Sequence, residues 1–148
     1  MNTNEQIKVT GALSIVKTNE YGEVTDSRYI PNLVVTVGKT HIMSRLTANT
    51  DTVMTHMGVG AGLVAPDPTN TSLGSVLGAR QSLVSVTAVS NVVTYVASFI
   101  AGVATGAIAE AGIFNALTGG IMLCRTQFPV VTKAAGDSIV ITWVVTLS

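Results

Sequence analysis

The chain has 148 residues, 47% of them hydrophobic, and its eight basic and eight acidic side chains give a formal net charge of zero. This length allows one domain with its own core, and the lack of a basic cluster argues against nucleic acid as a partner. A single cysteine excludes an internal disulfide framework and the usual four-ligand zinc sites. The first residues lack the charged and apolar regions of a signal peptide, so we expect none.

The charged residues are unevenly distributed along the chain. Twelve of them fall in positions 1–80 and only four in positions 81–148. Because a monomer rarely leaves so little charge on half its length, we expect a partner or a symmetry mate to cover apolar surface there. Residues 81–109 carry no charge at all, but serine, threonine, asparagine and glutamine recur through them. This pattern favours a pair of strands over a membrane span, and we expect no membrane partner.

Twenty threonines and twenty-two valines favour β-strands over helices. Residues 7–15, within a predicted strand at residues 5–17, alternate between apolar and polar side chains, which is typical of a half-buried strand. We expect them to pair with residues 23–35 through a turn at Asn19–Gly22. Pro31 has no N–H to donate to a ladder, so it places the second strand at an edge or a bulge.

A helical pattern interrupts the strands once, between residues 36 and 49. We predict a short helix at about residues 37–48 after a cap at Thr36. Three apolar residues follow at helical spacing: Ile42, Met43 and Leu46. Residues 61–78 contain two prolines and a polar run, which predict a long surface loop closed by a helical turn near Ser72–Leu77.

Two hairpins and a final strand complete the expected fold. Residues 81–89 and 92–101 form one hairpin, with its turn at Ser90-Asn91. Residues 108–116 and 121–128 form another, which turns at Thr118-Gly119-Gly120. The last strand places five apolar residues on one face: Ile139, Ile141, Trp143, Val145 and Leu147.

These elements predict an all-β fold, an antiparallel β-sandwich or jelly roll with one short α-helix. We expect a single domain over residues 1–148, of which residues 1–5 form an N-terminal arm. No internal repeat or low-complexity tract stands out, and we find no domain boundary.

Few residues suggest catalysis or ligand binding. The sequence GVGAG at residues 58–62 is similar to a phosphate-binding loop, but no Lys-Ser/Thr follows it and Pro66 stands where a helix should start. We interpret it as a strand that ends in a flexible turn.

The two histidines lack the neighbours of a metal site. His56 has no second metal ligand near it in sequence, so we expect a strand histidine. His41 has no partner four residues away, so we expect it to face solvent or to have a capping role. Cys124 lies among apolar neighbours and is interpreted as a packed, unreactive thiol.

The remaining motifs also have structural explanations. Asn70-Thr71-Ser72 matches a glycosylation sequon, which matters only in a eukaryotic secretory setting. Five aromatic residues are candidate packing or interface anchors: Tyr95, Phe99, Phe114, Phe128 and Trp143. We predict no catalytic residue, cofactor or metal.

Glu110 and Arg125 are lone opposite charges in an otherwise uncharged stretch. A tight turn at Thr118-Gly119 sets Gly112 opposite Arg125 and Phe114 opposite Leu123, which puts Glu110 diagonally across from Arg125 on one side of the sheet. Gly112 leaves room for the guanidinium to meet the carboxylate in a two-bond fork. No third catalytic group lies in the stretch, so we predict a structural pair that fixes the register of the hairpin.

Four segments of the chain resemble small virion proteins of tailed bacteriophages. They are residues 32–46, 56–80 and 95–128 and the terminal ITWVVTLS, so that the likeness covers residues 32–148. Two short motifs, or steps, carry the resemblance most clearly: Glu110-Ala111-Gly112-Ile113-Phe114 and Cys124-Arg125-Thr126-Gln127-Phe128. The resemblance implies a β-sandwich or jelly roll without enzymatic activity. Similar modules occur as capsid cement or decoration proteins and as tail or fibre components.

The resemblance leads to a first functional hypothesis, a capsid cement protein that binds the outer face of the major capsid protein shell and stabilises it. Such a protein is made in the host cytoplasm and resides on the capsid surface, where zero net charge fits better than on the DNA-facing side. We also expect a homo-oligomer, a dimer or a trimer. The alternatives are a tail or fibre-associated assembly or receptor-binding module and, in another class, a small β-barrel enzyme or ligand binder with convergent polar residues in a cavity.

Overall fold

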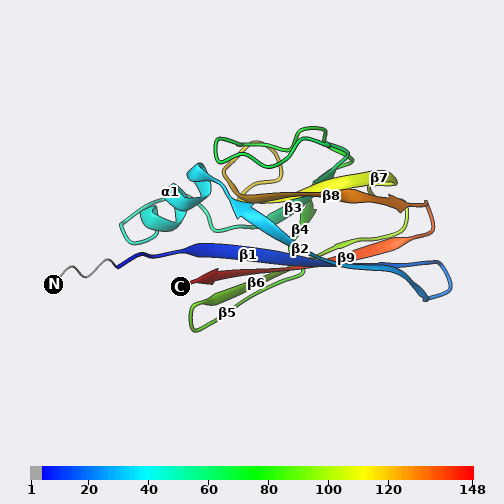
Figure 1. Ribbon diagram of the computed structural model, residues 1–148, viewed down its shortest axis with the longest axis horizontal. Coiled ribbons are helices and arrows are strands. Elements are labelled where there is room, and N and C mark those ends of the chain that lie inside the picture. The colour runs from blue at the N-terminus through cyan, green and yellow to red at the C-terminus, as the bar shows by residue number, and fades with distance from the viewer. Residues whose placement is uncertain (1–4) are drawn as a thin grey trace.

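The computed structural model describes residues 5–148 (Figure 1). Its elements in chain order are β1 (Val9–Thr18), β2 (Val24–Val34), α1 (Thr36–Ser44), β3 (His56–Gly60), β4 (Gln81–Ser82), β5 (Ser85–Val89), β6 (Val92–Phe99), β7 (Gly106–Phe114), β8 (Met122–Lys133) and β9 (Ser138–Leu147). The strands form a sheet in the order β4-β3-β7-β8-β2-β1-β9-β6-β5, and adjacent strands run antiparallel. The predicted all-β class with one short helix is therefore confirmed. The predicted N-terminal arm lies, apart from Glu5, outside the described residues.

Strand β2 joins the two parts of the sheet. Most of its length pairs with β1, whereas its last two residues, Leu33 and Val34, pair with Arg125 and Cys124 of β8. The sheet is therefore continuous and curls so that two layers face each other (Figure 1). We call the strands β2, β1, β9, β6 and β5 layer A, and the strands β8, β7, β3 and β4 layer B.

The core lies between the layers. Layer A contributes Leu13, Ile15, Phe99 and Trp143, and layer B contributes Met57, Ile108, Phe128 and Val131. Strand β9 alternates as predicted up to Val145, whereas Leu147 at its end is 42% exposed. Of the five candidate aromatic anchors, Phe99, Phe114, Phe128 and Trp143 are buried and Tyr95 is half-buried. All five therefore pack within the chain, Tyr95 as a half-buried neighbour of the main core.

This packing explains the low charge of residues 81–148. They supply β7, β8 and β9, which contain most of the buried positions of the protein. Large exposed apolar side chains are not concentrated in this half, since ten of the eighteen found within residues 5–148 precede residue 81. The scarcity of charge in the second half follows from its place in the core.

The predicted turns are present in two of the three hairpins, with differences at the strand ends. The side chain of Asn19 accepts hydrogen bonds from the N–H groups of Tyr21 and Glu23 and so closes the turn between β1 and β2. The hairpin of β5 and β6 turns at Ser90-Asn91 as expected. Its predicted first strand is split, however, because residues 81–82 pair with β3 in layer B. The hairpin of β7 and β8 is also present, but a loop over residues 115–121 connects its strands in place of the tight turn predicted at Thr118-Gly119.

The helix differs from the prediction in its cap and its exposed face. Val35 is the N-cap residue and makes no side-chain capping bond, so the predicted Thr36 cap is wrong. The helix ends at Ser44, and its buried residues are Gly38 and His41. Met43 and Leu46 are 60% and 78% exposed. Because α1 packs against β8, its buried side is set by that contact rather than by the apolar spacing.

The predicted helical turn at Ser72–Leu77 is also absent. The segment is irregular, and Val76 forms an isolated antiparallel bridge with Gly60. Main-chain groups of this segment form hydrogen bonds with other parts of the chain instead of helical ones. For example, the N–H of Leu77 donates to the C=O of Val59. The loop therefore lies against the end of β3.

Gly38 allows the close approach of α1 to β8 and gives a direct test of this packing. A Cβ atom at position 38 would collide with the main-chain oxygen of Leu123. We expect Gly38→Ala to destabilise the protein by about 1–3 kcal/mol in urea unfolding, although alanine favours helices by about 1 kcal/mol over glycine. The matched control is Gly136→Ala, where the added Cβ meets the flexible Glu20 side chain at 3.3 Å. Equal effects of the two changes would contradict the observed packing.

Candidate functional site

Glu110 on β7 and Arg125 on β8 form a buried ion pair. Arg125 pairs in register with Gly112, which leaves Glu110 on the diagonal as predicted. The Nη2 and Nε atoms of Arg125 lie 2.8 Å and 3.1 Å from Oε2 of Glu110. The side chains are 0% and 2% exposed. One detail of the predicted register is wrong, because an irregularity after Ile113 places Phe114 opposite Met122 rather than Leu123.

Arg125 makes the two predicted hydrogen bonds to Glu110, but both of them go to the same carboxylate oxygen, Oε2. Oε1 of Glu110 accepts hydrogen bonds from the N–H groups of Gly62 at 3.0 Å and Ser75 at 2.7 Å. Oε2 accepts one from the N–H of Gly74 at 2.9 Å, in addition to the two from Arg125. The carboxylate thus holds five hydrogen bonds, all from this chain.

The guanidinium of Arg125 reaches the same loop. Its Nη1 donates to Oδ1 of Asn70 at 3.0 Å, and its Nη2 donates to the main-chain oxygen of Val64 at 2.9 Å. Asn70, which begins the glycosylation sequon, also accepts a hydrogen bond from the N–H of Asp67. The loop between β3 and β4 is therefore bound to the ion pair at five residues: Gly62, Val64, Asn70, Gly74 and Ser75.

The glycine-rich segment at residues 58–62 has a function that the sequence analysis missed. A Cβ atom added at Gly60 or Gly62 would lie 2.5 Å from Oε1 of Glu110. One residue of the segment, Gly62, donates its N–H to the Glu110 carboxylate, and the missing side chains of Gly60 and Gly62 leave room for that carboxylate. The signal in the sequence was the combination of this segment with a single acidic residue in an apolar strand.

A second, smaller apolar cluster lies under the same loop. Val35, Leu73, Phe114 and Met122 are buried together on the side of layer B that faces away from the main core. The guanidinium of Arg80 lies 3.4 Å from the centre of the Phe114 ring and donates hydrogen bonds to main-chain oxygens of the turn between β7 and β8. The loop, which runs over the top of layer B in Figure 1, is thus a packed cover for that layer.

The electrostatics of the pair favour a permanently charged carboxylate. Burial acts to raise the pKa of Glu110, but the N–H groups of Gly74 and Ser75 and the Arg125 guanidinium outweigh it, so the pKa is lowered below 4.5. A carboxylate that stays ionised and has both oxygens engaged is a poor proton acceptor. The pair is therefore suited to holding the loop rather than to chemistry.

The other candidate residues form no hydrogen bond with this pair, although Cys124 directly precedes Arg125 in β8. Nδ1 of His56 lies 2.7 Å from Oγ1 of Thr55 and its Nε2 lies 3.4 Å from Oγ of Ser82, as suits a strand histidine. Cys124 is buried, and this burial raises the pKa of its thiol. Within residues 5–148, no three histidine, cysteine, aspartate or glutamate side chains lie close enough together to hold a metal ion.

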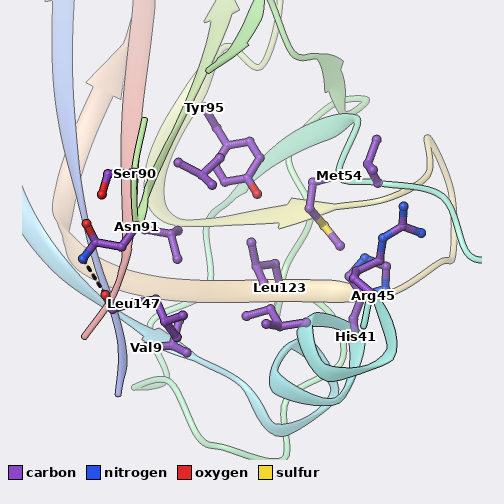
Figure 2. Close-up of a pocket in the computed structure, with 13 residues that line it drawn as sticks. Val9, His41, Arg45, Met54, Ser90, Asn91, Tyr95, Leu123 and Leu147 are labelled. Carbon is purple, nitrogen blue, oxygen red and sulfur yellow. Dashed lines mark hydrogen bonds between the residues drawn. The ribbon is translucent and has the colours of Figure 1, made fainter. Parts of the chain in front are cut away.

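A pocket opens between α1 and the inner side of layer A (Figure 2). It has a volume of about 330 Å³ and is lined mostly by apolar side chains, among them Met54 and Leu123. The Tyr95 hydroxyl points into it (Figure 2), and burial raises the pKa of that hydroxyl to about 12. His41, expected in solvent or at a cap, is instead 6% exposed and lines this pocket, since the helix turns it toward the core.

Comparisons with known proteins gave no relative: no family model, no curated protein and no solved structure matches the chain. In the described part of the chain, no helix has the length and apolar character that crossing a membrane requires.

The buried pair predicts a strong coupling between its two residues. We expect Arg125→Ala to destabilise the protein by about 3–5 kcal/mol, because it leaves the Glu110 carboxylate buried without its cation. The double change of Glu110 and Arg125 to alanine should cost less than the sum of the single changes in a double-mutant cycle measured by chemical denaturation.

The partly exposed pair of Asp26 and Arg28 provides the control for this cycle. Its side chains are 22% and 27% exposed, so Asp26→Ala should cost at most about 1 kcal/mol. Strictly additive losses for Glu110 and Arg125 would show that they are not energetic partners.

His41 predicts a dependence of stability on pH. Burial, and to a smaller extent the charge of Arg45, lower its pKa below 6.5, while Asp51 opposes them. Below pH 6.5 the unfolded chain binds a proton that the folded chain does not, so the free energy of unfolding should fall as the pH is lowered from about 7.5 to 5.5. His41→Gln should reduce this fall, and His56→Gln is the control for loss of an imidazole. An unchanged pH profile in the His41 variant would rule out this residue as its source.

Proposed function

We propose that the protein is a non-enzymatic structural protein of a tailed phage virion, and specifically a capsid cement protein. In this function it binds the outer face of the major capsid protein shell after synthesis in the host cytoplasm and stabilises the shell. The observation that carries the proposal is that the buried ion pair of Glu110 and Arg125 holds a loop in place. Its hydrogen bonds hold a loop of the same chain, so the most elaborate polar arrangement of the protein serves its own rigidity.

The residues that carry the resemblance to phage virion proteins support the same conclusion. The Glu110–Phe114 step lies in β7 and the Cys124–Phe128 step lies in β8, where they supply the ion pair and neighbouring core residues. Arg80, on which the resembling loop closes, stacks on Phe114. The residues on which the resemblance rests are therefore packing residues, as suits proteins that work by assembly.

A rigid, neutral β-fold also suits attachment to a shell. A cement protein stabilises neighbouring capsid subunits only as far as it resists deformation itself, and close packing with a pinned loop provides such resistance. A tail or fibre-associated assembly or receptor-binding module of a tailed phage is the alternative, because it would use the same fold for the same physical reasons. The two hypotheses differ in the number of copies in a virion.

Copy number and shell binding test the proposal. We expect hundreds of copies of this chain in purified particles when it is quantified against the major capsid protein, and we expect the pure protein to bind shells that lack it and to raise their melting temperature. A handful of copies per particle would favour the tail or fibre alternative. A protein absent from particles, or one that ignores shells and leaves their melting unchanged, would refute the cement function.

A further inference from the structure

The strands of layer A carry no charged side chain on the side that faces away from the core. We call this side the outer face of layer A. Strand register defines its members, since Ala12, Val144 and Thr94 lie side by side across β1, β9 and β6. The residues of this face are Thr10, Ala12, Ser14, Val16, Ser27, Tyr29, Pro31, Ser85, Thr87, Val89, Val92, Thr94, Val96, Ser98, Val140, Thr142, Val144 and Thr146. All of them are exposed or half-buried.

The charges of layer A are all on the opposite side. Lys17, Asp26 and Arg28 are the charged residues within its strands, and their register places them on the side of the core. Lys17 Nζ donates to the main-chain oxygen of Thr132 at 2.8 Å, and Arg28 donates to that of Val130 at 3.1 Å. The fold therefore directs all three charged side chains of these strands away from the outer face. The solvent-facing side of a sheet, by contrast, is ordinarily polar.

The two layers differ in how their outer sides are covered. The loop between β3 and β4 packs over the outer side of layer B through Leu73 and Arg80. No element within residues 5–148 covers the outer face of layer A, where Tyr29 is 75% exposed and Val89 is 72% exposed. The protein thus leaves one broad neutral sheet surface for a neighbour.

The size of this face suits a stable protein interface. Five strands of about eight residues span roughly 24 Å by 26 Å, or on the order of 600 Å² in projection. The accessible area of a corrugated face is larger than its projection, and a standard interface buries about 800 Å² on each partner. Pairing through the edge of β5 alone would engage only five residues, too few for such an area.

We propose that the outer face of layer A is the contact between two copies of this chain. A second copy brings the same neutral surface, so that neither unpaired charge nor like-charge repulsion enters the interface, whereas a charged partner would bury charges without counterparts. Packing of valine and threonine side chains across two sheets resembles the packing between sheets within proteins. Because β9 is the central strand of layer A, the two-fold axis lies near Val144, whose copies meet there.

Charge reversal at the axis tests this contact. We expect the full-length protein to sediment as a dimer over a concentration series, and Val144→Lys or Val144→Glu alone to weaken dimerisation at least about 100-fold, because each places like charges at the axis. An equimolar mixture of the two variants should recover the dimer, since opposite charges then meet. Recovery also shows that both variants are folded. Thr94→Lys and Thr94→Glu, at the neighbouring position on β6, provide a second pair if either Val144 variant fails to fold by circular dichroism.

Val86→Lys is the control on the edge strand. Val86 is 49% exposed and lies on β5, away from the proposed axis, so this change should leave the dimer intact. A monomeric wild-type protein, or a dimer that withstands both charge reversals, would overturn the proposal. Loss of the dimer in Val86→Lys alone would overturn it in favour of pairing between β5 edges. The experiment uses no capsid, so its outcome is independent of shell binding, and the self-contact stands or falls separately from the cement function.

Discussion

The buried carboxylate of Glu110 is the constraint on which layer B and its loop depend. An ionised group without solvent must receive hydrogen bonds from its surroundings, or the fold pays a penalty of several kcal/mol. Here the bonds come from Arg125 and from main-chain N–H groups of a loop that has no regular structure. The same interaction thus supports the register of β7 against β8 and determines the path of the loop. Small changes in the loop glycines would therefore disturb the strands beneath it.

Local patterns predicted the strands, two of the hairpin turns and the diagonal ion pair. Alternation along β9 and the short turns of the β1–β2 and β5–β6 hairpins require only neighbouring residues, and the Glu110–Arg125 pair follows from the register of β7 against β8. The errors arose where distant segments meet. Thr36 does not cap α1, His41 points inward and residues 81–82 leave their hairpin for β3, because β8 and β3 compete with the local preferences. The carboxylate-binding use of residues 58–62 was hidden for the same reason, since its anion lies 48 residues away in the chain.

The two sides of the curled sheet serve different purposes. The outer side of layer B is covered by the chain itself, through a packed loop and a second small apolar cluster. Layer A keeps its charges toward the interior side, where main-chain oxygens of β8 receive them. In the proposed dimer, layer B provides rigidity and the outer face of layer A provides the contact.

The position of the last strand has a consequence for the order of folding. Strand β9 lies between β1 and β6, so it joins a hairpin from the start of the chain to one from its middle. The residues of both hairpins are synthesised before residues 138–147, but neither hairpin has its full set of neighbours until β9 is in place. Layer A therefore closes late, as a single event in which Trp143 and its neighbours enter the core, and until that moment the strand edges of β1 and β6 remain open to pairing with other chains.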